Sequence, residues 1–238
     1  MNHNTAQHAG PQSDTTQPDT AQPETAHSDT AREWDERYRS REQLFSGNAN
    51  GVLVTEADGM SPGQALDVGC GEGGDALWLA RRGWQVMAVD VSEVALRRAA
   101  AAGTDVEDRV SWAQADLAVT PPPAGAFDLV TVQYFPLLRS AGLPALRGLV
   151  DAVAPGGTLL FATHALADLK EHTEATAEFD PADYYWADDI AALLDADGDS
   201  DSDSAWKIQV NETRERTAPA PPGTHHHRDT VLRAQRTA

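Results

Sequence analysis

The sequence predicts an α/β protein with a seven-stranded, mostly parallel sheet, helices on both faces and an antiparallel strand pair at its C-terminal end. Short apolar runs alternate with helical segments from about residue 64 onward. The first apolar run ends in a cluster of glycines, and two further strand-like segments close the chain. Near-continuous apolar strands separated by helices are typical of a parallel sheet that is covered on both faces.

The elements can be placed in order along the chain. We expect strands over residues 64–68, 85–89, 109–113, 127–133, 158–163, 206–213 and 230–236. We expect helices over 29–42, shortly after the break at 46–51, and over 75–82, 92–102, 144–153 and 187–194. Ser92 is a favourable helix cap, and Pro144 suits the first turn of a helix. Five strand–helix units are thus followed by a hairpin.

Two segments have little capacity to pack. Residues 1–30 are predicted to be a disordered acidic tail, because their apolar surface is too small to offset the entropy of ordering. Residues 195–204 are predicted to be an acidic loop. Its alternating aspartates lack the glycine and glutamate of a calcium-binding loop, so no metal is expected there. Residues 31–238 are predicted to form one domain, with a helical segment over 31–60.

Composition argues against several partners. The 238 residues include 18 Lys and Arg against 37 Asp and Glu, a formal charge of −19, which is unfavourable for nucleic acid or an anionic membrane. The single cysteine, Cys70, cannot form an intrachain disulfide. There is no apolar run of about 18 residues. We therefore expect a cytoplasmic monomer that acts on a small molecule, with no nucleic acid and no membrane as partner.

The glycine cluster is the first candidate binding site. It follows Asp67 and contains Gly69, Gly71 and Gly73 at the junction of the first strand and the next helix. Glycine lets the backbone turn tightly and approach a ligand closely. The spacing of Gly69, Gly71 and Gly74 also satisfies a dinucleotide fingerprint, and a glycine-rich turn without a ligand is a further alternative.

Two acidic residues follow the next strands. Asp90 ends the second strand, where a carboxylate can accept both hydrogens of a ribose diol. The alternative is a helix cap shared with Ser92. Asp116, just after the third strand, would face the same crevice and could accept a hydrogen bond from an adenine amino group. The alternative is a turn aspartate that precedes the prolines at 121–123.

Together these motifs resemble a known family. The acidic residue and glycines after strand one, the acid that ends strand two, Ala115-Asp116-Leu117, Phe127-Asp128-Leu129-Val130 and Pro155-Gly156-Gly157 resemble class I S-adenosylmethionine-dependent methyltransferases. The terminal hairpin is similar to strands six and seven of that family. The resemblance covers about residues 31–238. It implies a Rossmann-like fold, S-adenosyl-L-methionine as cofactor and methyl transfer as activity.

The resemblance also implies roles for individual residues. The cofactor-binding set would be Asp67, Gly69, Gly71, Gly73, Asp90, Val91, Asp116, Leu117 and Gln133. The glycines would line the methionine part, and Asp67 would hold its amino group directly or through water. Asp90 would bind the ribose, and Asp116 with Leu117 the adenine. Gln133 and Tyr134 would border the sulfonium and the methyl acceptor.

A narrower resemblance lies near the start of the domain. The run from Trp34 to Tyr38 and the stretch Leu44–Asn50 look like small-molecule methyltransferases of the thiopurine and tellurite-resistance type. Phe45 stands where those enzymes often have Trp, and Ala49 where they have Pro. The resemblance implies that residues 31–60 cover the cofactor as a lid, with Trp34 and Tyr38 beside it. The alternative is that these two side chains pack on the core.

Methyl transfer is an in-line displacement at a carbon activated by positive sulfur, so the protein mainly aligns the reactants and excludes water. A soft acceptor needs no base, whereas a hydroxyl or amine does. His164, at the end of the fifth strand, is the candidate base, and Tyr134 is a second candidate catalytic residue. A capping or packing role is the alternative for His164. Tyr184 and Tyr185, with Asp183, are candidates for lining the acceptor pocket.

The leading hypothesis is therefore an S-adenosylmethionine-dependent methyltransferase acting on a small molecule. An NAD(P)-dependent oxidoreductase is the first alternative, since it uses a similar glycine turn. Asp67, Asp116 and the terminal hairpin argue against it. The second alternative is a non-catalytic module that keeps the cofactor-binding fold, and the sequence leaves this open.

Overall fold

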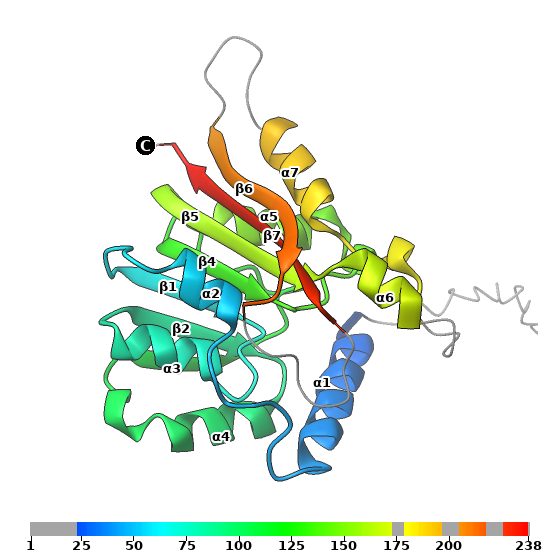
Figure 1. Cartoon of the computed structure of the whole chain (residues 1–238). Coiled ribbons are helices and arrows are strands. Elements are labelled where there is room, and N and C mark those ends of the chain that lie inside the picture. Colours follow the sequence, from blue (N-terminus) through cyan, green and yellow to red (C-terminus); the bar gives the residue numbers. More distant parts are fainter. Residues whose placement is uncertain (1–22, 173–178, 197–204, 218–225, 238) are drawn as a thin grey trace, which may run out of the picture.

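The computed structural model describes residues 23–172, 179–196, 205–217 and 226–237. The predicted tail up to residue 22 and residues 197–204 of the predicted acidic loop lie outside these ranges. The described ranges form a seven-stranded sheet with the order β3-β2-β1-β4-β5-β7-β6 (Figure 1). Its strands are β1 (Gln64–Val68), β2 (Gln85–Asp90), β3 (Val110–Gln114), β4 (Phe127–Gln133), β5 (Val153–His164), β6 (Trp206–Glu215) and β7 (Arg228–Arg236).

The strand directions confirm the predicted fold class. Strands β1 to β5 are parallel to one another, and β7 runs antiparallel to both β5 and β6. The order reverses between β1 and β4, which is the place where open α/β sheets form a crevice at their carboxyl edge. The ends of β1, β2, β4 and β5 therefore bring the sequence-predicted site residues to one side of the molecule.

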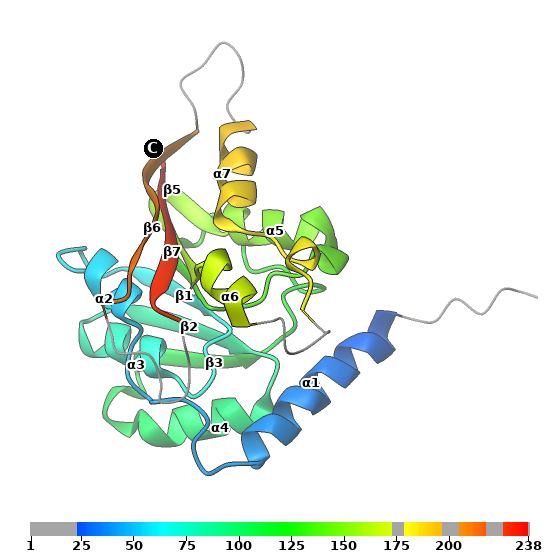
Figure 2. The same cartoon turned by 45° about the vertical axis from the view of Figure 1, so that its right-hand side comes forward.

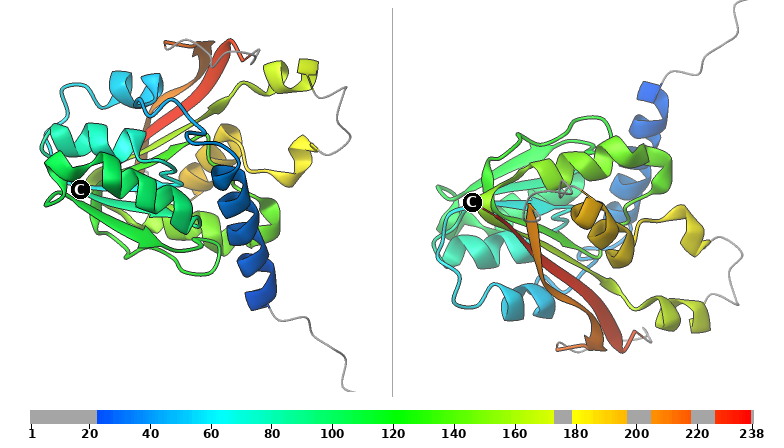
Figure 3. Two further views of the ribbon diagram at one scale, coloured as in Figure 1. Left: turned by 90° about the horizontal axis from the view of Figure 1, so that it is seen from below. Right: turned by 90° about the horizontal axis from the view of Figure 1, so that it is seen from above.

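Helices cover both faces of the sheet (Figure 3). They are α1 (Pro23–Arg39), α2 (Gly51–Glu56), α3 (Gly74–Arg81), α4 (Glu93–Ala102), α5 (Gly142–Asp151), α6 (Leu166–His172) and α7 (Ala187–Ala196). One buried cluster joins the sheet to α5 and α7, and another joins it to α2, α3 and α4. None of the helices in the described ranges is both long and apolar enough to cross a bilayer.

Three elements differ from the sequence-based expectation. Helix α1 begins at Pro23, so the last part of the predicted tail is helical, and the helix packs against α4 (Figure 2). Helix α6 was not expected at all. Strand β5 begins at Val153, and its pairing with β4 shifts register around the Pro-Gly-Gly turn. Each of these differences depends on packing between elements, which local sequence patterns do not contain.

Asp168 joins α6 to the start of β7, and its removal is expected to destabilise the protein. Its carboxylate is 3% exposed and accepts hydrogen bonds from the backbone N–H groups of His227 and Arg228, both at 2.9 Å, and from the Arg228 side chain. Asp168→Ala should lower the free energy of unfolding by about 2–4 kcal/mol, because two backbone N–H groups and the Arg228 side chain lose a charged acceptor. Urea titration measures this change.

Asp105→Ala is the matched control for that prediction. Asp105 pairs with Arg81 at 2.8 Å, but both side chains are about half exposed. Exposed ion pairs contribute little, so the urea midpoint of this variant should stay close to that of the unmodified protein. Equal destabilisation by the two substitutions would contradict the account of Asp168.

Candidate functional site

The glycine turn between β1 and α3 requires glycine at three positions. Gly69, Gly71 and Gly73 have φ angles of 66°, 51° and 85°, in the left-handed region that other residues avoid. A Cβ on Gly71 would also lie 2.9 Å from the hydroxyl oxygen of Tyr38. The turn is therefore fixed both by its own conformation and by the close approach of α1.

Asp90 connects the end of β2 to this turn. It is 9% exposed, its Oδ2 accepts a hydrogen bond from the Gly71 N–H at 2.9 Å, and its Oδ1 accepts one from the Ser92 N–H at 2.8 Å. Burial raises the pKa of Asp90 against the opposing effect of these bonds. Ser92 caps α4 through its own hydroxyl, which accepts from the Ala95 N–H at 3.1 Å. Asp90 thus orders the turn in addition to bordering the helix start.

Two further carboxyl groups, those of Asp67 and Asp75, are buried next to the glycine turn. Asp67 is 2% exposed, and its Oδ2 has no hydrogen-bond partner within the described part of the chain. Burial, followed by the nearby Asp75, raises the pKa of Asp67 well above its ordinary value. Burial also raises the pKa of Asp75 to about 6, although it accepts bonds from the backbone and side chain of Asn50 at 2.6 and 2.8 Å. An incoming cation or hydrogen-bond donor would satisfy the unpaired oxygen of Asp67.

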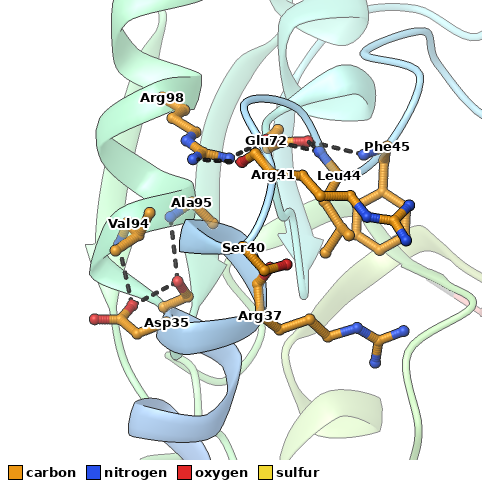
Figure 4. Close-up of polar contacts among 11 residues, drawn as sticks. Asp35, Arg37, Ser40, Arg41, Leu44, Phe45, Glu72, Val94, Ala95 and Arg98 are labelled. Atoms are coloured by element: carbon orange, nitrogen blue, oxygen red, sulfur yellow. Dashed lines mark hydrogen bonds and ion pairs between the residues drawn. The ribbon is translucent and has the colours of Figure 1, made fainter.

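The segment before α2 is held on the glycine turn by Glu72 (Figure 4). The carboxylate of Glu72 accepts hydrogen bonds from the N–H groups of Leu44 and Phe45 at 3.1 and 3.0 Å. It also pairs with Arg98 of α4 at 2.9 Å, and Arg98 in turn donates to the Arg41 carbonyl oxygen at 2.9 Å. We call these contacts the Glu72 clamp.

Helix α1 is fixed by a separate contact at the start of α4 (Figure 4). Asp35 Oδ1 accepts from the Ser92 hydroxyl at 2.7 Å and from the Val94 N–H at 3.2 Å. Its second oxygen pairs with Arg39 at 2.8 Å. Neither Asp35 nor Glu72 was expected from the sequence as a functional residue, although Glu72 stands inside the glycine motif.

The two aromatic residues of α1 occupy different places. Tyr38 is 2% exposed and lies over the glycine turn, whereas Trp34 is partly buried and packs on the small cluster of Tyr38, Val94 and Ala95. The two rings lie 6.0 Å apart. Trp34 thus packs on the core, and Tyr38 both packs on the core and contacts the turn, while contact of either side chain with a cofactor stays a prediction.

Of the other predicted cofactor residues, Asp116 forms a turn after β3. Its Oδ1 accepts from the Ala118 N–H at 2.8 Å, as the turn alternative expects, and Leu117 packs against the core. The Val91 carbonyl oxygen accepts from the Gln114 side chain at 3.0 Å. Binding of an adenine at this edge remains a prediction.

Gln133 is buried at the end of β4. Its Nε2 donates to the Thr131 hydroxyl at 3.0 Å, and its Oε1 lacks a hydrogen-bond partner among the residues that the structure describes. A second unpaired polar atom thus lies at the carboxyl edge of the sheet.

Comparison with known proteins shows a similarity to methyltransferases. Residues 65–157 match a family model described as a methyltransferase domain, and this stretch includes β1 to β4 with the glycine turn and Asp90. This stretch of the chain is therefore similar to a methyltransferase domain. The predicted residues Asp67, Gly69 and Asp90 all lie inside the matched stretch.

Two curated relatives illustrate the similarity. The chain is 31% identical over 143 residues to malonyl-[acyl-carrier protein] O-methyltransferase of Salmonella typhimurium, covering 58% of this chain and 53% of the relative. It is 33% identical over 112 residues to ajmaline N-methyltransferase of Rauvolfia serpentina, covering 45% and 38%. The chain thus spans about half or less of the length of the curated relatives it matches.

A solved structure extends the fold similarity beyond residues 65–157. N-methyltransferase NodS from Bradyrhizobium japonicum, in complex with S-adenosyl-L-homocysteine, superposes with a TM-score of 0.64. The match covers 87% of this chain and 99% of NodS at 18% sequence identity. At that identity the match supports the shared fold, including the terminal hairpin.

A polar cluster lies where β4, β5 and β6 end and where β7 begins. The rings of Tyr134 and His164 are 4.6 Å apart, and Tyr134 has a φ of 55°, which is uncommon for a bulky residue. Arg216 Nη1 lies 3.0 Å from His164 Nδ1 and 3.0 Å from Asp229 Oδ1. Arg216 and Asp229 were not expected from the sequence, because only tertiary contact brings them to His164.

The candidate acceptor-lining tyrosines lie on a neighbouring loop. A short 3₁₀ helix begins at Pro181, and the Tyr185 N–H donates to the Leu137 carbonyl oxygen at 2.8 Å. Tyr184 stacks on Phe179 with ring centres 5.2 Å apart. The loop is thus tied to the chain that follows β4, while contact with an acceptor stays a prediction.

Proposed function

We propose that the protein is an S-adenosylmethionine-dependent methyltransferase that moves a methyl group to a small-molecule acceptor. One observation carries the proposal above the others. In a matched methyltransferase domain, the left-handed glycine turn is bonded to Asp90 at the carboxyl edge of the sheet. The similarity to small-molecule and acyl-carrier methyltransferases supports the acceptor class.

The residues present fit the chemical groups of this cofactor. The unpaired Oδ2 of Asp67 suits the amino group, because a cation favours the ionised form of a buried carboxyl group. The free lone pairs of Asp90 suit the ribose hydroxyls, and Asp116 with Leu117 would border the adenine. When bound, the cofactor supplies a methyl group on positively charged sulfur.

The chain itself would align and shield the reactants. The segment before α2 is anchored over the glycine turn through Glu72, and Tyr38 is buried against Gly71. Such cover excludes water from the site and restricts the geometry of approach, which together account for most of what this reaction requires of a protein. The predicted lid role of residues 31–60 is part of the proposal.

Calorimetric titration of the full chain tests the proposed cofactor. S-adenosylmethionine and S-adenosylhomocysteine should bind with micromolar affinity, and NAD and NADP should not bind. Preferential binding of NAD or NADP would contradict the proposal and favour the oxidoreductase alternative. If the first two bind but no thiol, selenide, tellurite or phenol is methylated, the non-catalytic alternative is favoured.

Cofactor affinity is expected to depend on pH. The pKa values of Asp67 and Asp75 are raised by burial, so these groups hold protons in a range where ordinary carboxyl groups are ionised. A bound ammonium favours the ionised forms, so binding releases protons and tightens as pH rises. Between pH 5 and 7 the affinity for S-adenosylhomocysteine should increase by up to about tenfold per unit for each proton released.

Titration in buffers of different ionisation enthalpy counts the released protons. Asp67→Asn removes one titrating group while keeping nearly the same shape, and it should flatten the pH dependence. An affinity that stays constant, or that weakens as pH rises from 5 to 7, would contradict the assignment of the amino group to Asp67.

A further inference from the structure

We infer that His164 acts as a hydrogen-bond donor through its Nε2–H, and that the methyl acceptor presents a carbonyl or anionic oxygen to it. Arg216 and Asp229 are the positioning residues that hold His164 in this state. The inference rests on the proposed function, since it describes the acceptor side of the same site. It replaces the base role expected from the sequence.

The contact with Arg216 determines which ring nitrogen of His164 carries the hydrogen. Arg216 Nη1 lies 3.0 Å from His164 Nδ1, and a guanidinium group can only donate. Nδ1 must therefore accept, and the neutral ring carries its hydrogen on Nε2. Among the described residues, none forms a hydrogen bond with Nε2. The His164 side chain as a whole is 28% exposed.

Asp229 keeps the guanidinium in place. It is 2% exposed and accepts from the same Arg216 nitrogen at 3.0 Å. The Tyr134 ring also lies 5.2 Å from the guanidinium carbon of Arg216. Asp229 therefore contacts Arg216, and Arg216 contacts both His164 and the ring of Tyr134.

The groups that surround His164 keep its ring neutral. Burial, then the stacked ring of His226 at 4.0 Å, then Arg216 lower the pKa of His164 to about 3. Asp168 acts in the opposite direction, and Asp229 lies 3.9 Å from Nδ1 behind the guanidinium. The cationic form is thus disfavoured throughout the physiological range.

A ring in this state cannot serve as a base. The lone pair of Nδ1 is used by Arg216, and Nε2 already carries a hydrogen. The acceptor atom therefore attacks the methyl carbon without passing a proton to His164, while the carbon–sulfur bond breaks and sulfur keeps its electron pair. This arrangement fits an acceptor whose reacting atom arrives deprotonated and whose oxygen receives the Nε2–H bond.

Nitrogen-15 NMR of the unliganded full chain tests the tautomer independently of catalysis. Long-range proton–nitrogen correlations should show His164 with its hydrogen on Nε2 and no titration above about pH 4. A hydrogen on Nδ1, or an ordinary titration near pH 6.5, would overturn the inference. Failure of cofactor binding in the calorimetric experiment would instead count against the proposed function and leave this result unaffected.

Benzoate serves as the oxygen-bearing probe on protein saturated with S-adenosylhomocysteine. It should shift the Nε2 resonance of His164, and His164→Gln, whose amide N–H can still donate, should bind benzoate within about threefold of the unmodified protein. His164→Ala should bind it about tenfold or more weakly. If benzoate leaves the Nε2 resonance unmoved, or if the two variants bind it equally, the acceptor part of the inference is wrong.

Arg216→Gln tests the positioning role. Without the guanidinium beside Nδ1, the pKa of His164 should rise, and both tautomers should become populated. A merely structural role for Arg216 would leave the His164 tautomer and titration unchanged in the folded variant, and that result would contradict the positioning role.

Discussion

Asp90→Ala should abolish measurable binding of S-adenosylhomocysteine, with an affinity loss of about 100-fold or more. Two charge-assisted hydrogen bonds to the ribose diol would disappear. The substitution would also remove the acceptor for the Gly71 and Ser92 N–H groups, so the glycine turn would lose the contact that orders it. Calorimetric titration at neutral pH measures the loss directly.

Asp128→Ala is the matched control for Asp90→Ala. Asp128 also accepts a backbone N–H, from Gln64 at 2.8 Å, but at the opposite edge of the sheet, where β1 begins. It should therefore leave the affinity unchanged. Asp90→Asn keeps the shape and one oxygen acceptor, and it should retain the fold while binding weakly. Undiminished binding by a folded Asp90→Ala variant would contradict the ribose role.

Glu72→Ala should release the segment over the glycine turn. Two backbone N–H groups, of Leu44 and Phe45, would lose their acceptor, and Arg98 would lose its partner. Bonds to a charged acceptor contribute about 1.5–3 kcal/mol each, so local opening should become at least about 30-fold more frequent. Native-state hydrogen exchange of residues 41–50 reports this opening.

Glu93→Ala provides the comparison for the Glu72 clamp. Glu93 lies on the same helix as Arg98, but its contact with Arg97 is 3.8 Å long and both side chains are mostly exposed. Exchange of residues 41–50 should match the unmodified protein. Unchanged exchange in Glu72→Ala would show that the segment is held by other contacts and would refute the clamp.

Much of the fold follows from local sequence patterns. Apolar runs such as 64–68 and 127–133 predict central strands because both faces of each strand are covered. The glycine turn could also be predicted, since Gly69 and Gly71 are needed for its left-handed backbone. The strand that ends in Asp90 likewise places its carboxylate at the carboxyl edge without knowledge of tertiary contacts.

The residues that were not predicted depend on contacts between distant parts of the chain. Glu72 and Leu44, which form a hydrogen bond, are 28 positions apart in the sequence, and Arg216 and His164 are 52 positions apart. The proposed tautomer of His164 depends on such a contact, which the sequence does not show. Helix α1 also begins earlier, at Pro23, than the start at residue 29 that the local sequence pattern predicts.

A crystal structure of the full chain with S-adenosylhomocysteine would test the central claim most directly. The account predicts that the ribose hydroxyls contact Asp90, that the amino group lies at Asp67 Oδ2 directly or through one water, and that Tyr38 covers the bound molecule. Density for the ligand in any other cavity, or a ribose that does not contact Asp90, would contradict it.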